Sequence, residues 1–143
     1  MIVKTHELWS GETGLYVVRD PRDVYCSYSR YMSHLKGRFV STEELIDESW
    51  SKHVVSWRKP DVHVVRYEDL LSDPIVAMRD VLGRLAIDTS EVGDLPDLGN
   101  LHAGCGWYYQ VGKAGRYRNE LTQSAINLCE SVNGPVMREL GYF

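Results

Sequence analysis

The residues best suited to chemistry lie where an apolar run of the chain ends. Residues 15–18 are apolar, and Arg19 and then Asp20-Pro21 follow them. Such a run is typical of a buried strand, and ligands of an open α/β sheet bind at the carboxyl ends of its strands. Guanidinium and hydroxyl groups suit a phosphate, so Arg19 and Ser27, two helical turns further along, are candidate phosphate-binding residues. The alternative is an Arg–Asp pair that caps a junction between strand and helix.

A second candidate cluster lies at the end of a short strand that we predict over residues 2–5. The segment Lys4-Thr5-His6 would place an ammonium group and an imidazole at the same edge of the sheet as Arg19. A histidine can act as a general base near neutral pH, and a lysine can stabilise anionic oxygens during group transfer. The alternative is an ordinary exposed strand end.

Two further segments carry groups that could contact a nucleotide. The segment RYEDL at residues 66–70 follows a strand predicted over residues 62–65, and its Tyr67 could stack on a base or pack in the core. Later in the chain, Gly112, Lys113 and Arg116 lie in a basic loop with two glycines. Glycines let backbone N–H groups approach a phosphate closely.

Helices must position these segments, and the spacing of apolar residues predicts them. Pro21 begins a helix that runs to about residue 35. Thr42 begins a second helix, whose buried stripe includes Trp50 and Trp57. Helices that alternate with strands along the chain indicate an α/β fold with a parallel sheet.

The second half of the chain predicts three more helices. Asp73-Pro74 begins the first of them. Its predicted buried face consists of Ile75, Met78, Leu82 and Leu85. Helices are also predicted over residues 122–132 and 135–140, whereas residues 86–118 are predicted to be mostly irregular.

Composition excludes several classes of protein. The 143 residues suit a single domain spanning residues 1–143, and 16 basic against 20 acidic residues argue against a nucleic-acid binder. No apolar run is long enough to span a membrane. Cys26, Cys105 and Cys129 are widely spaced and the histidines form no HExxH motif, so we expect no disulfide, no metal and a reducing, cytoplasmic setting.

In their order and spacing, these segments resemble the sulfotransferase family that uses 3′-phosphoadenosine 5′-phosphosulfate (PAPS). The family pattern has a KTH-type segment, a strand ending in R-[DN]-P-x-D with a later serine, a W-x-x-H-V-x-x-W helix, RYEDL and a late G-x-x-G-x-[WY]-[KR]-N loop. This chain supplies residues 4–6, 19–27, 50–57, 66–70 and 112–119, and a terminal ELGY at residues 139–142. The resemblance covers nearly the whole chain and implies a P-loop-NTPase-like parallel sheet flanked by helices.

The resemblance also implies roles for the candidate residues. His6 would deprotonate a hydroxyl or amine acceptor, and Lys4 would contact the transferring sulfuryl group. Arg19 and Ser27 would hold the 3′-phosphate of the nucleotide, and Tyr67 would lie near the adenine. The loop residues Gly112, Lys113 and Arg116 would close over that phosphate. PAPS would be the co-substrate, a small molecule the acceptor, and no metal is required.

The chain departs from the family pattern in two places. We find no loop for the 5′-phosphosulfate, which in the family precedes the KTH segment, so the domain is expected to be truncated at its N-terminus. The usual Arg-Lys before the late glycine is Gln110-Val111 here. An open edge beside residues 2–5 would invite a second copy or a partner chain. The alternatives are a non-catalytic remnant, which binds the 3′-phosphate half or serves as an oligomerising module, and a P-loop nucleotide kinase.

Overall fold

The described part of the chain is built around a parallel pair of strands. The computed structural model describes residues 6–11, 13–86 and 113–143. In these residues β1 (Gly14–Val18) and β2 (Val62–Arg66) pair in parallel, with Gly14 opposite Val62 and Val18 opposite Arg66. The predicted α/β fold with a parallel sheet is therefore confirmed. The strand predicted over residues 2–5 lies outside the described residues.

Between the strands, the chain forms α1 (Pro21–Lys36) and α2 (Ser49–Trp57). Helix α1 begins at the predicted residue, because Pro21 fixes its first turn and the Asp20 carboxylate accepts a hydrogen bond from the Arg22 backbone N–H. It ends at Gly37, whose φ of 60° lies in the left-handed region that favours glycine. The carboxyl end of β1 thus leads within two residues into a long, well-capped helix.

The second helix begins later than its sequence predicts. The prediction that it starts at Thr42 is wrong, since residues 42–48 form turns and bends and α2 starts only at Ser49. The Asp47 carbonyl accepts hydrogen bonds from the Tyr25 hydroxyl and from the Asn133 side-chain amide. These partners lie on α1 and α7, so tertiary contacts compete with the local helical pattern.

Two helices follow β2, namely α3 (Tyr67–Ser72) and α4 (Pro74–Arg84). The predicted start of α4 is confirmed, because the Asp73 side chain caps the helix and Pro74 begins it. Its predicted buried face is wrong at Ile75, which is 61% exposed, whereas Val81 is 1% exposed. The helix contacts β2. The spacing of apolar residues therefore predicted the helix but not all of its buried side chains.

The C-terminal part forms α6 (Tyr117–Glu120) and α7 (Gln123–Glu139). The prediction of two helices over residues 122–140 is wrong, because α7 continues through Pro135. A proline inside a helix removes one backbone hydrogen bond. Here Asn133 and Met137, on either side of it, are completely buried, so packing keeps the helix continuous.

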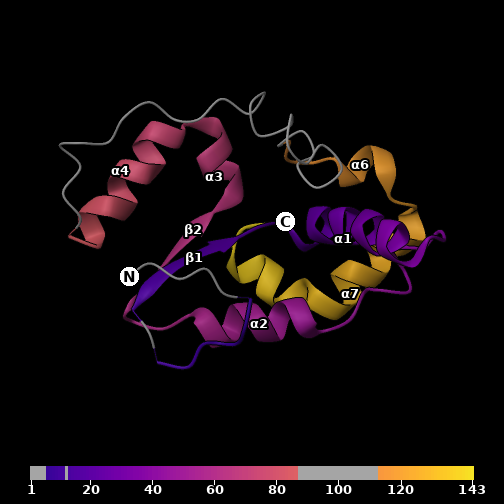
Figure 1. The fold of residues 1–143 in the computed structure, drawn as a ribbon, viewed down its shortest axis with the longest axis horizontal. Coiled ribbons are helices and arrows are strands. Elements are labelled where there is room, and N and C mark those ends of the chain that lie inside the picture. Colours follow the sequence, from indigo (N-terminus) through magenta and orange to yellow (C-terminus); the bar gives the residue numbers. More distant parts are fainter. Residues whose placement is uncertain (1–5, 12, 87–112) are drawn as a thin grey trace.

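The main core lies between β1 and three helices. Figure 1 shows α1, α2 and α7 grouped on one side of the strands, and α3 with α4 on the other. Seven buried side chains form this core: Val18, Tyr25, Trp50, Val54, Cys129, Met137 and Tyr142. Trp50 and Trp57 are both buried, as predicted. The core thereby holds the carboxyl ends of the strands, where the candidate site begins.

Two simple features of the described residues complete the fold. Cys26 and Cys129 are free and buried, and Cys105 lies outside the described residues. None of the described helices is long and apolar enough to cross a membrane.

Candidate functional site

The carboxyl ends of the two strands bring two of the predicted residues together. Because Val18 lies opposite Arg66, the next residues along each strand, Arg19 and Tyr67, are neighbours. The guanidinium carbon of Arg19 lies 4.5 Å from the centroid of the Tyr67 ring. This distance is that of a cation–π contact, which restricts the position of the guanidinium group.

Arg19 is only partly satisfied by its protein contacts. Its Nη2 donates to the Lys113 carbonyl at 2.9 Å and lies 3.4 Å from Asp23 Oδ2. Its Nε is buried and has no hydrogen-bond partner among the described residues, although the side chain as a whole is 21% exposed. An unpaired N–H of a charged group is costly, and an anionic oxygen is the acceptor that best satisfies it. Arg19 therefore suits an anionic ligand.

Asp23 anchors the glycine loop to α1, a role that sequence reasoning missed. Its carboxylate is completely buried, with Oδ2 accepting from the Gly115 backbone N–H at 2.7 Å and Oδ1 from the Tyr117 N–H at 3.0 Å. Gly115 has a φ of 75°, which favours glycine. These two backbone N–H groups thus bind a protein carboxylate. The sequence signal was Asp23 in R-D-P-x-D, but its partners are distant in the chain.

A cluster of cationic side chains extends along the same side of α1. Arg116 Nε donates to Glu120 Oε1 at 2.8 Å, and Arg30 forms an ion pair with the other oxygen of the same carboxylate. We call Arg19, Arg30 and Arg116, with Asp23 and Glu120, the arginine face. Sequence reasoning singled out Arg19 and Arg116 and missed Arg30.

Ser27 lies on α1 between the two ends of the arginine face. It follows Asp23 by one helical turn and precedes Arg30 by one, so the three residues share a side of the helix. Ser27 is exposed, whereas Asp23 is buried. The structure therefore leaves the predicted serine accessible beside the cationic side chains.

The pKa of the Cys26 thiol depends on burial and on the charges near this turn of the helix. Burial and the negative charge of Asp23 raise the pKa of Cys26 to about 11, while the charges of Arg30, Arg116 and Arg19 act in the opposite direction. Charge effects fall with distance, so this opposing effect agrees with the positive charge that the ion pairs place along α1. Burial, and next the positive charge of Arg116, lower the pKa of Arg30.

The remaining predicted site residues are Lys113, Lys4, Gly112 and His6. Lys113 is exposed and contributes its carbonyl to Arg19, and Lys4 and Gly112 lie outside the described residues. His6 is exposed, and the next residue accepts a hydrogen bond through its carbonyl from Trp57 Nε1 at 2.9 Å. The chain at His6 is thus fixed against the last residue of α2. No contact among the described residues joins it to Arg19.

A second network ties the strand ends to the C-terminus. Glu68 Oε1 accepts from the Asp20 backbone N–H and Oε2 accepts from the Tyr142 hydroxyl, both at 3.1 Å. Arg22 donates to Asp20, to Glu130 and to the Tyr142 carbonyl. The protein satisfies these groups itself, so we interpret this network as structural.

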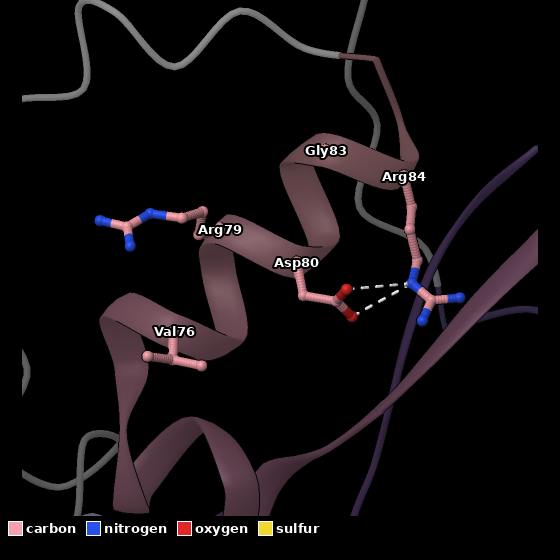
Figure 2. Close-up of a pocket in the computed structure, with 5 residues that line it drawn as sticks. All are labelled: Val76, Arg79, Asp80, Gly83 and Arg84. Carbon is pink, nitrogen blue, oxygen red and sulfur yellow. Dashed lines mark hydrogen bonds and ion pairs between the residues drawn. The ribbon is translucent and has the colours of Figure 1, made fainter.

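Two pockets flank these elements. One of about 350 Å³ lies at the strand ends and is lined by Asp20, Arg22, Arg66, Glu68, Ala114, Gly115, Tyr117, Arg118, Gly141, Tyr142 and Phe143. The other, of about 440 Å³, is lined by five residues of α4 alone. Figure 2 shows that its charged groups are the ion-paired Asp80 and Arg84 and an outward Arg79. Neither pocket includes Arg19, Ser27 or Arg30, so the candidate site is the open arginine face.

Comparison with known proteins agrees with this arrangement. The model of the sulfotransferase domain family matches residues 8–94, which is more than half of the chain. The crystal structure of mouse sulfotransferase SULT7A1 complexed with PAP is similar to the fold, with a TM-score of 0.65 and 16% sequence identity. No curated protein shows significant sequence similarity to the chain.

The structural match extends over most of this chain but not over most of the neighbour. It covers 90% of this chain and 59% of the mouse protein. The parallel strands and the flanking helices match the fold of this neighbour. From the family match, supported by the fold, we conclude that the chain belongs to the sulfotransferase domain family.

Proposed function

We propose that the chain binds the 3′-phosphate half of PAPS and takes part in transfer of the sulfuryl group to a hydroxyl or amine acceptor. The observation that carries the proposal is Arg19, a partly exposed cation at the carboxyl edge of the sheet whose buried Nε has no acceptor among the described residues. The mouse neighbour, which was solved with PAP, supports the choice of nucleotide. Membership of the sulfotransferase domain family supports the reaction.

The predicted binding residues and Asp23 have separate roles in this proposal. Arg19 and Ser27 bind oxygens of the 3′-phosphate, because both are accessible on one side of α1. Tyr67 orients Arg19 by stacking and offers an edge near the adenine. Lys113 and Arg116, with Gly112 from the same loop, close over the phosphate. Asp23 holds that loop in place through the Gly115 and Tyr117 backbone N–H groups.

The chemical step belongs to the other end of the nucleotide. PAPS, as donor substrate, supplies the sulfuryl group. His6 takes the proton from the acceptor as the new bond to sulfur forms and the bond to the 5′-phosphate breaks, and Lys4 stabilises the transferring oxygens. The 3′- and 5′-substituents project from different sides of the ribose, so the separation of His6 from Arg19 is compatible with one bound nucleotide.

Calorimetric titration of the chain tests the nucleotide site. We expect 3′-phosphoadenosine 5′-phosphate (PAP) to bind at least about tenfold more tightly than adenosine 5′-phosphate, since the 3′-phosphate adds charge-assisted hydrogen bonds. Arg19→Ala should abolish that difference. Arg38→Ala is the matched control, because Arg38 is exposed and pairs with Glu44 outside the arginine face. Equal losses for both nucleotides would contradict the 3′-phosphate site.

A non-catalytic protein that binds the 3′-phosphate half, or serves as an oligomerising module, is the second candidate. The hydrogen bond that fixes the His6 segment against α2, away from Arg19, favours it. Turnover separates the two: in a catalytic protein His6→Ala lowers the single-turnover rate by roughly 10²–10⁴ and leaves PAP binding unchanged. PAP binding without any turnover by the unmodified chain would support the second candidate. The cytoplasmic setting, a small-molecule acceptor and a second copy or partner chain remain predictions.

A further inference from the structure

We propose that Arg30, together with Arg116, is a second cationic contact for the 3′-phosphate and determines the preference for a 3′-phosphorylated nucleotide. This inference rests on the proposed nucleotide site and adds to it a residue that the sequence motifs do not include. Arg30 lies on α1, one turn beyond Ser27 and on the same side of the helix. Its guanidinium group reaches the Glu120 carboxylate, which Arg116 also contacts.

Contacts along α1 connect three arginines that come from distant parts of the chain. Arg19 follows β1, Arg30 lies on α1, and Arg116 immediately precedes α6. All three act on the charge of the Cys26 thiol, which is buried next to Ser27. Their side chains are 21%, 31% and 22% exposed, respectively, so a ligand at Ser27 can approach each of them.

Each carboxylate of the arginine face is shared between several partners. Asp23 is completely buried and accepts two backbone hydrogen bonds from the glycine loop, and it lies 3.4 Å from Arg19. Glu120 is one carboxylate shared by Arg30 and Arg116. Each of these two carboxylates therefore serves more than one donor, and a phosphate, with its several anionic oxygens, is a suitable further acceptor for the guanidinium groups.

A bound phosphate would replace Glu120 in part of its contact with the arginines. A guanidinium group has several N–H donors in a planar fork, so Arg30 can turn from one carboxylate to a phosphate without losing its charge pairing. Glu120 then acts as an internal competitor of the ligand. If the contacts of Arg30 and Arg116 with Glu120 only hold α1 and α6 together, removal of Glu120 should instead weaken nucleotide binding.

Four variants compared by calorimetry test the proposal. Arg30→Gln should weaken PAP binding by about 10- to 100-fold and leave adenosine 5′-phosphate binding unchanged. Arg30→Lys, which keeps the charge but not the fork, should lose less. Arg38→Gln is the matched control, and thermal unfolding of each variant verifies that it remains folded. Glu120→Gln should tighten PAP binding several-fold, because the competing carboxylate is removed.

The outcomes separate this inference from the function on which it rests. A chain that prefers PAP over adenosine 5′-phosphate, and whose preference survives Arg30→Gln, would overturn the role of Arg30 alone. Weaker PAP binding by Glu120→Gln in a folded protein would favour the structural link and also overturn it. An unmodified chain with no preference for PAP would overturn the nucleotide site and this inference together.

Discussion

Two regions on either side of β1 use polar groups in opposite ways. In the aromatic cluster of Tyr16, His53 and Trp57, the Tyr16 hydroxyl lies 3.0 Å from His53 Nδ1 and the Tyr16 and Trp57 rings stack with centroids 5.7 Å apart. The Tyr16 hydroxyl and His53 Nδ1 are paired with each other, and Trp57 Nε1 donates to the Glu7 carbonyl. In the arginine face, Arg19 Nε has no partner among the described residues, and two arginines share Glu120.

The difference indicates which region is closed and which is ready for a ligand. Aromatic side chains with satisfied polar groups stabilise the fold by burial, and a ligand would gain little from contacting them. Arg19, whose Nε has no acceptor among the described residues, leaves free energy to be gained on binding. Variants of the aromatic cluster should therefore change stability alone, and variants of the arginine face should change nucleotide binding.

The largest expected effect is on stability, in the aromatic cluster. Trp57→Ala should lower the free energy of unfolding by about 3–5 kcal/mol, because it removes a large buried side chain that stacks on Tyr16 and donates to the Glu7 carbonyl. Urea unfolding measures this loss. Phe39→Ala is the control, since Phe39 is 79% exposed and its removal should cost little. A near-neutral Trp57→Ala would refute the assignment of this cluster to the core.

Asp23→Asn should have a smaller effect on stability but should also weaken nucleotide binding. The amide cannot accept from both Gly115 and Tyr117 as the carboxylate does, and its charge no longer faces Arg19, so we expect a loss of about 1–3 kcal/mol. PAP affinity should fall about tenfold, because the loop and Arg19 are no longer held together. Stability lost without any loss of PAP affinity would show that the anchor serves the fold alone.

Alkaline pH should give the smallest effect and compares the two thiols directly. Burial raises the pKa of Cys26 from 9.0 to about 11 and that of Cys129, in the core, from 9.0 to about 12. Raised folded-state pKa values favour the protonated, folded protein, so this contribution is complete below pH 9 and is lost as the pH rises through the folded-state values. The free energy of unfolding should fall by about 2 kcal/mol for each thiol between pH 9 and pH 11.

Cysteine variants assign this alkaline loss to one region or the other. Cys129→Ala should flatten the pH dependence more than Cys26→Ala, since the arginines near Cys26 partly stabilise its thiolate. Urea unfolding at each pH measures both. An unchanged slope in Cys129→Ala would show that other groups, such as Tyr16 with its raised pKa of about 12, dominate.

Much of the fold follows from local sequence signals. Pro21 and Pro74, each preceded by an aspartate, mark the starts of α1 and α4, and Gly37 ends α1. These signals act through residues adjacent in the chain, so they can be recognised in the sequence without a structure. The predicted helix boundaries at Thr42 and Pro135 are wrong. Near them, the Asp47 carbonyl accepts from Tyr25 of α1 and from Asn133 of α7, and Asn133 accepts from Ser51 of α2.

The candidate site divides in the same way. The sequence alone determined that Arg19 follows a strand and that Ser27 lies on the helix after it, because strand, proline and helical spacing are local properties. The predicted burial of that strand is wrong in part, since Val18 is buried but Val17 is 44% exposed. Only the tertiary structure decided that Asp23 binds the glycine loop and that Arg30 and Arg116 meet at Glu120. Those contacts join residues far apart in the chain, and their strength depends on burial and on charges contributed by elements that no local pattern brings together.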